Sequence, residues 1–292
     1  MQRRESALRE QIDELEKRGD FVGMVQPLTD LVDVLSRKCN GPGYAVSTET
    51  ADYAATLDRL GGLHRNLGNL DEAQEIYSEA VKVSAAVFGT NDPNYATTLN
   101  NFAGLQRLRK NYKESDEAYS RAEKIYNDTV GPDHVFTISC LNNRGLLRQD
   151  EGRWEDALAL HEEALRRLRS RPGDETAEAT TLNNIATALY SQGKVDEALE
   201  RMEEASKIYL EHVGEASDLY LGQVNNLASL NLAAGNFEEA AKKLEWVVRR
   251  ARESFGPTSQ PAQISARNLA YAYKQLGRDD DAQRVAAEAD SK

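Results

Sequence analysis

Apolar side chains along this chain recur at helical intervals, and the runs that carry them come in pairs. In residues 92–130 the first run extends to about Arg109, and the second begins after a short turn at Lys110-Asn111. This spacing predicts two amphipathic helices. Asp92 followed by Pro93 marks the start of the first helix, because a carboxylate caps free N–H groups and proline fits the first turn. The face of the second helix carries Tyr112, Ser115, Tyr119, Ala122 and Tyr126.

Glycines divide the chain into units of about forty-two residues. One set stands at the turn inside each pair, with Lys110 in place of one glycine: Gly68, Gly152, Gly193, Gly235 and Gly277. A second set ends each pair: Gly89, Gly131, Gly173, Gly214 and Gly256. Two glycines per unit at a fixed period indicate a repeat array, which buries its core between neighbouring units.

Side-chain size also repeats. Bulky residues hold one position of the first helices: Leu60, Phe102, Ile185, Leu227 and Leu269. Small residues hold one position of the second helices: Ala73, Ser115, Ala157, Ala198, Ala240 and Ala282. Small positions that face large ones let helices approach closely, and burial of each large side chain contributes roughly 1.5–3 kcal/mol.

These columns resemble the tetratricopeptide repeat (TPR), and a Leu-Asn-Asn phrase is similar to the kinesin-light-chain type. The phrase stands at 99–101, 141–143 and 182–184, and Val224 leads a fourth copy; the linkers Asn91-Asp92-Pro93 and Gly131-Pro132-Asp133-His134 also match. The resemblance covers about Asp52 to Ala289. It implies an all-α fold, a right-handed superhelix (α-solenoid) of about seven helix-turn-helix units.

We expect one continuous solenoid. Residues 1–45 are expected to form a degenerate N-terminal capping hairpin, with Leu8, Ile12 and Leu15 in one stripe and Phe21, Met24, Leu28 and Leu31 in the other. Extra residues are expected in the loop 40–50. Six repeats fill residues 50–292, with approximate bounds 50–90, 92–131, 133–173, 174–214, 216–256 and 258–290.

The family resemblance implies that first helices line a concave groove that binds peptides. The first asparagine of each phrase is expected to face it: Asn100, Asn142, Asn183 and Asn225. An amide donates and accepts, so it can hold a peptide backbone; alternatively these amides bond neighbouring helices and order the stack. Small residues such as Gly222 leave room at the rim. Further groove candidates are Arg65, Arg107, Tyr190 and Lys274, and the arginines either receive acidic side chains or are simply solvated.

Three residues break their columns. Arg144 replaces the apolar residue found in neighbouring repeats, and either it extends its charged end to solvent or it contacts a ligand. Trp246 stands where other repeats have Glu79, Arg121, Glu163 or Glu204, which favours either a contact surface or packing on the next unit. His161 takes the place of Tyr77 and Tyr119, so we expect it in the core.

Composition narrows the function. The net charge is −12, and no basic stripe dominates, which argues against nucleic-acid binding; the run 166–171 is best explained as a helix end. Cys39 and Cys140 stand far apart in the sequence, which fits two free thiols in a reducing compartment. No signal-peptide core precedes the first helix, and no apolar run could span a membrane. A cytoplasmic location is therefore expected. The four histidines have no metal-binding spacing. We therefore predict no catalytic residue, metal or cofactor.

The sequence favours a protein-interaction scaffold or adaptor that binds an extended peptide or partner helix. The alternative is a sensor module of a signalling system that acts in trans or is excised from a larger protein. Self-association through the end units is a further hypothesis. If the asparagines clamp a peptide, changing Asn142 and Asn183 to alanine weakens peptide binding and leaves the melting temperature nearly unchanged; a large loss of thermal stability without a selective loss of binding favours the stacking role.

Overall fold

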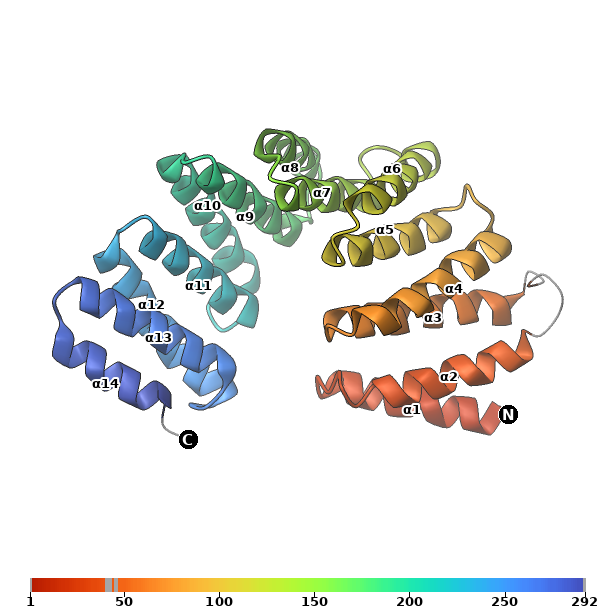
Figure 1. Cartoon of the computed structure of the whole chain (residues 1–292), viewed down its shortest axis with the longest axis horizontal. Helices are drawn as coiled ribbons and strands as arrows, with labels where there is room; N and C mark the ends of the chain where they lie inside the picture. Colours follow the sequence, from red (N-terminus) through yellow and green to blue (C-terminus); the bar gives the residue numbers. More distant parts are fainter. Residues whose placement is uncertain (1, 40–43, 45–46, 291–292) are drawn as a thin grey trace. The chain divides into compact units, whose positions relative to one another are not determined.

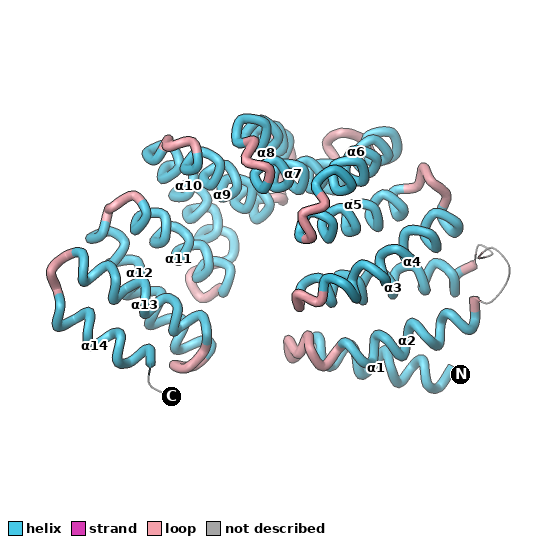
Figure 2. The backbone as a smooth tube through the Cα atoms, viewed as in Figure 1, coloured by secondary structure: helices cyan, strands magenta, loops and turns pink. Residues whose placement is uncertain are grey.

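The computed structural model describes residues 2–39, 44 and 47–290, and these residues form helices and loops with no strand. Fourteen helices follow one another in this described part as about seven helix-turn-helix repeats (Figure 1). Where the connections are described in full, short loops join successive helices (Figure 2). Odd-numbered helices are the first helices of the repeats and even-numbered helices are the second. The all-α prediction is confirmed, and the expected insertion at 40–50 lies largely outside the described residues.

The chain divides into two compact units, Met1–Gly152 and Arg153–Lys292. The first contains α1 (Gln2–Lys17), α2 (Val25–Lys38), α3 (Thr48–Asn66), α4 (Leu70–Phe88), α5 (Pro93–Leu108), α6 (Tyr112–Thr129) and α7 (Val135–Asp150). The second contains α8 (Trp154–Arg169), α9 (Glu175–Ser191), α10 (Val195–Val213), α11 (Asp218–Ala233), α12 (Phe237–Phe255), α13 (Gln260–Gln275) and α14 (Asp279–Asp290).

Within Met1–Gly152 each helix packs on the next, and the core lies between them. Tyr77 of α4 and Tyr119 of α6 are almost fully buried. Gly61 of α3 must be small, because a Cβ added there would lie 3.0 Å from the ring of Tyr77. The size pattern predicted from the sequence is therefore a packing requirement.

The N-terminal hairpin α1–α2 forms largely as expected. Leu8 and Ile12 of α1 and Met24, Leu28 and Leu31 around α2 are buried. The inclusion of Phe21 in the second stripe was wrong, because its side chain is 54% exposed. The physical reason is that α2 begins only at Val25, so Phe21 lies in the preceding turn.

The turns keep one geometry even where glycine is missing. Gly68 has φ +82°, in the left-handed region that glycine enters freely, and Lys110 adopts φ +63° at the equivalent turn. The predicted cap at Asp92 is present, because its carboxylate accepts a hydrogen bond from the N–H of Asn94 at 2.8 Å. His134 caps α7 in the same way, with Nδ1 accepting from Phe136 N–H at 3.2 Å.

Within Arg153–Lys292 the same sequential packing joins α8 to α14, with core clusters between successive helices. His161 lies fully buried on α8, as the core hypothesis predicted. Burial lowers the pKa of its imidazole to about 4, because the charged form loses its hydration. His161 is therefore neutral near pH 7.

Candidate functional site

The asparagines of the repeated phrase link neighbouring first helices. In Met1–Gly152, Asn143 Nδ2 of α7 donates to Asn100 Oδ1 of α5 at 3.1 Å. Asn101 Nδ2 of α5 donates to Asp58 Oδ2 of α3 at 2.7 Å. The half-buried Asn142 lies beside Asn143 on α7. Amide hydrogen bonds thus connect α3, α5 and α7 from side to side.

The same arrangement recurs in Arg153–Lys292 with other partners. Asn183 Nδ2 of α9 donates to Gln223 Oε1 of α11 at 2.5 Å, and Gln223 Nε2 donates to the carbonyl of Met202 at 3.1 Å. Ser265 Oγ of α13 donates to Asn225 Oδ1 of α11 at 3.3 Å. The structure therefore supports the stacking role of these asparagines, and it leaves peptide binding open.

Asn100 and Asn225 each keep an unused Nδ2 donor among the described residues, because the one side-chain hydrogen bond of each is accepted by Oδ1. Asn225 is half-buried, and within the described residues the only hydrogen bond of its side chain is the one that Oδ1 accepts from Ser265. Its Nδ2 group therefore remains available to an acceptor on another molecule.

Asn225 lines a cavity of about 390 Å³ between α11 and α13, with α12 as its floor. The floor and walls are apolar: Leu221, Val247 and Ala251 are buried, and Phe255 and Ile264 are 43% and 44% exposed at the rim. Gly222 opens the rim, because a Cβ added there meets no atom within 4 Å. We call this site, lined by 218, 221, 222, 225, 247, 251, 255, 260, 261, 264 and 265, the α11–α13 groove.

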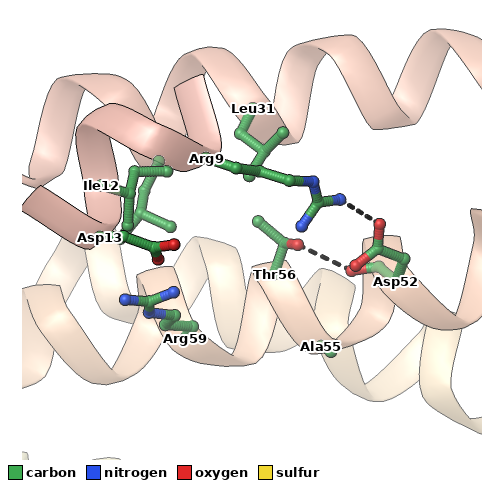
Figure 3. A pocket seen from close by; sticks show the side chains of 9 residues that line it. Arg9, Ile12, Asp13, Leu31, Asp52, Ala55, Thr56 and Arg59 are labelled. Atoms are coloured by element: carbon green, nitrogen blue, oxygen red, sulfur yellow. Dashed lines mark hydrogen bonds and ion pairs between the residues drawn. The ribbon is translucent and has the colours of Figure 1, made fainter. Parts of the chain in front are cut away.

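A cavity of about 240 Å³ is lined by residues of α1, α2 and α3 at the corresponding place in the first repeats, but its chemistry is different (Figure 3). Counted from the turn glycines, Arg9 stands at the position of Asn225, and Thr56 at the position of Ser265. Arg9 forms ion pairs with Asp52 and, at 3.1 Å, with Glu5. This N-terminal site is therefore charged and internally paired, whereas the α11–α13 groove is mostly apolar.

The predicted groove arginines of Met1–Gly152 are engaged with the protein. Arg107 Nη1 pairs with Asp150 Oδ2 at 2.8 Å. Arg65 Nη1 donates to the carbonyl of Asn101 at 3.5 Å and would lie 3.1 Å from a Cβ added at Gly104. Arg65 and Arg107 are therefore not simply solvated, which was one of the two alternatives that the sequence left open.

Asp58 carries an unusual ionisation in this region. Burial raises the pKa of its carboxyl group to about 6, although the hydrogen bond from Asn101 and the charge of Arg65 oppose the shift. Its Oδ1 atom is buried and has no hydrogen-bond partner among the described residues. The negative charge of the ionised Asp58 carboxylate is therefore stabilised by too few hydrogen bonds to offset its loss of hydration.

The other candidates are dispersed. Arg144 does not extend freely into solvent, because it pairs with Glu123 and lies 3.7 Å from Asp116. Tyr190 OH donates to the carbonyl of Ala233 at 3.5 Å. Lys274 is exposed on α13, and within the described residues it forms no ion pair. Trp246 Nε1 donates to Glu215 at 3.0 Å on the second-helix side.

Sequence reasoning missed most of the α11–α13 groove. The sequence singled out none of Val247, Ala251, Phe255 and Ile264 as groove residues. A signal was present for Gly222, which stood out as a small residue at the rim. Ile264 also leaves an apolar side chain 44% exposed on a first helix, which only the packed structure reveals.

Models of the tetratricopeptide repeat match residues 52–128, 107–170 and 137–211, and a second model of this repeat matches residues 225–292. The chain belongs to the tetratricopeptide repeat family. Only these repeats are detected, and no catalytic domain is evident. A comparison with curated protein sequences finds no match.

Solved TPR structures are similar in fold at low sequence identity. A provisionally assigned kinesin light chain of Podosopora anserina has 21% identity and a TM-score of 0.60 over 68% of this chain and 94% of that one. The TPR sensor protein of the STAND ATPase class from Pyrococcus horikoshii has 16% identity and a TM-score of 0.67, over 98% and 42%. A Rap protein in complex with competence and sporulation factor has 16% identity and a TM-score of 0.63, over 91% and 79%.

Two searches of the described residues complete the picture. None of their helices is long and apolar enough to cross a membrane. None of their histidine, cysteine, aspartate and glutamate side chains form a group of three or more that could hold a metal ion.

Proposed function

We propose that this TPR protein is an interaction module that binds an extended peptide or a partner helix in the α11–α13 groove. TPR modules generally bind proteins. The observation that carries the proposal is an apolar cavity of about 390 Å³ beside an amide donor with no partner among the described residues. Ligand sites are typically concave and apolar with a few polar groups that fix orientation.

The groove divides the recognition between two kinds of contact. An apolar side chain of the ligand enters between Ile264 and Phe255 and covers the buried floor at Val247. Asn225 Nδ2 donates to a backbone carbonyl of the ligand, which holds the chain without reading its side chain. Rigid helices on both sides keep the ordering cost of the protein small.

The remaining predicted residues fit a supporting role. Asn100 and Asn183 hold neighbouring first helices in register through their hydrogen bonds to Asn143 and Gln223. Tyr190 and Lys274 extend the binding face along α9 and α13 in this proposal.

The test begins with random peptides displayed on phage and selected on the wild-type protein. Selected peptides are then measured by fluorescence anisotropy against Gly222→Leu, Asn225→Ala and Asn226→Ala. A Cβ at position 222 meets no atom within 4 Å and leucine favours the helix, yet the rest of its side chain occupies the groove, so we expect at least about tenfold weaker binding. Loss of the Asn225 hydrogen bond is expected to weaken binding about fivefold.

Asn226→Ala is the matched control, because Asn226 is the exposed second asparagine of the same phrase. It should bind as wild type does. If all three variants bind the selected peptides as tightly as the wild type does, the proposed site is contradicted. Circular dichroism establishes that each variant is folded.

A sensor module is the second candidate function. It is favoured by the likeness to a TPR sensor in the STAND protein, which extends over 98% of this chain. In that case the bound peptide changes the arrangement of the repeats. Small-angle X-ray scattering with and without a selected peptide distinguishes a sensor from a rigid scaffold, because only the sensor shows a changed profile.

A further inference from the structure

Helix α12 carries a basic and aromatic surface on a different side from the groove residues Val247 and Ala251. It consists of Trp246 and the four cations that lie three or four residues from it, Lys242, Lys243, Arg249 and Arg250, and the same spacing places Glu239 and Glu253 at its two ends. We call it the α12 basic face. Such a cluster is unexpected in a chain with a net charge of −12.

We propose that the α12 basic face binds an acidic segment of a partner protein, as a second interaction surface separate from the α11–α13 groove. The ligand places an apolar side chain beside Trp246 and carboxylates at both ends of it. This proposal does not rest on the occupation of the groove.

Two depressions flank Trp246. One, of about 270 Å³, lies between α10 and α12 and has Tyr220, Val224 and Leu227 of α11 along its lining. The other, of about 530 Å³, is lined by Glu215, Ala216, Arg249, Arg250 and Glu253. Trp246 lines both, so its indole forms a ridge between two depressions that each carry charged groups, the smaller one Glu215, Lys242 and Lys243.

The cations of this face are only partly used by the protein. Arg250 pairs with Glu253 at 2.9 Å, and Lys243 lies 3.9 Å from Glu239. Lys242 and Arg249 are exposed and form no ion pair among the described residues. Charge complementarity therefore calls for an anionic partner.

The spacing selects the form of the partner. Lys243 and Arg250 are seven residues apart, about 10 Å along the helix axis. An extended peptide covers that distance in about three residues. A segment with two pairs of acidic residues around one apolar residue therefore meets both pairs of cations and the ridge.

Two other anionic partners fit less well. The Trp246 indole is half-buried, packs against the edge of Tyr220 at 5.5 Å and donates to Glu215, so the ring does not project as a membrane anchor would. Glu215 lines both depressions, and Glu239 and Glu253 pair with Lys243 and Arg250, so the face lacks the continuous positive track that a nucleic-acid backbone follows.

The probe is a fluorescein-labelled peptide of sequence Gly-Glu-Glu-Leu-Glu-Glu-Gly, compared with its glutamine counterpart by anisotropy at low salt. We expect the acidic peptide to bind at least about tenfold more tightly than the glutamine peptide, and the double variant Lys242→Glu/Arg249→Glu to lose that preference. The control Lys113→Glu/Lys194→Glu makes the same change in net charge at exposed positions elsewhere and should bind as wild type does.

A second variant tests the ridge. Trp246→Glu restores the residue type of Glu79, Glu163 and Glu204 at this repeat position, so it should fold and should lose the acidic peptide. The proposal is overturned if the acidic peptide fails to bind, if the double variant binds it normally, or if phosphatidylserine vesicles or single-stranded DNA bind the face more tightly. Both variants should retain peptides selected for the groove, which separates this result from a failure of the proposed function.

Discussion

Replacement of Asp58 by asparagine should make the protein more stable at neutral pH. Asp58 lies between α3 and α5, where it accepts a hydrogen bond from Asn101 at 2.7 Å and its second oxygen is buried without a partner. Asparagine keeps an oxygen for the Asn101 bond and removes the buried charge. The stacking of first helices is therefore preserved while the electrostatic cost is lost.

The size and sign of the effect follow from the pKa of Asp58, which burial raises from 3.8 to about 6. A raised aspartate pKa means that the folded state binds the proton more tightly than the unfolded state does. The free energy of unfolding of the wild type therefore falls as the pH rises from about 4 to 6 and stays low above that. At 1.36 kcal/mol for each pKa unit, the ionised carboxylate costs about 3 kcal/mol near pH 7.

Urea unfolding followed by far-UV circular dichroism measures this cost. The difference in unfolding free energy between Asp58→Asn and wild type should be small near pH 4 and should grow by about 3 kcal/mol by pH 7. Asp128→Asn, at an exposed position of α6, is the control and should show no such growth. A difference that is independent of pH, or that is largest in acid, would refute the reasoning.

Three further changes test other parts of the structure. In the wild type, the free energy of unfolding should fall by about 3 kcal/mol as the pH falls from 6.5 to about 4, because His161 takes up a proton there only in the unfolded state. His161→Met, which copies Met202 of the next repeat, should remove this loss. Urea unfolding curves recorded at several acidic pH values measure the difference. Lys110→Gly should raise the free energy of unfolding by about 1 kcal/mol, because Lys110 has φ +63° and glycine adopts this left-handed conformation without strain. An unchanged midpoint of thermal unfolding would contradict the presence of strain at Lys110. Asn183→Ala should lower the free energy of unfolding in urea by about 2 kcal/mol, because the buried Gln223 side chain loses the hydrogen bond that Asn183 donates to it. An unchanged free energy of unfolding would argue against the stacking role of Asn183.

The fold was predictable because each repeat carries local signals. Gly68 and its counterparts mark turns that need a left-handed residue, and Asp92-Pro93 marks a helix start that the structure retains. The period placed Lys110 where the other repeats have glycine, and the structure shows that it adopts the left-handed conformation there. Phe21 was assigned wrongly because the degenerate first repeat lacks a clear start for its second helix, which begins at Val25.

The candidate site was predictable only in part. Sequence indicated that Asn100, Asn183 and Asn225 lie on the first helices, but their partners are about forty residues away, and the pattern does not say which neighbour bonds to which amide. The α11–α13 groove combines three helices, so its shape depends on packing. The exposure of Ile264 follows from that packing and is not visible in the order of residues.

The most direct test of the account locates a selected peptide on the protein. Methyl-labelled protein is titrated with a phage-selected peptide and followed by NMR. The account predicts the largest shifts at Ile264, Leu221 and Val247, which line the α11–α13 groove, and their loss in Gly222→Leu. Shifts confined to Met1–Gly152, with Ile264 and Leu221 unchanged, would contradict it.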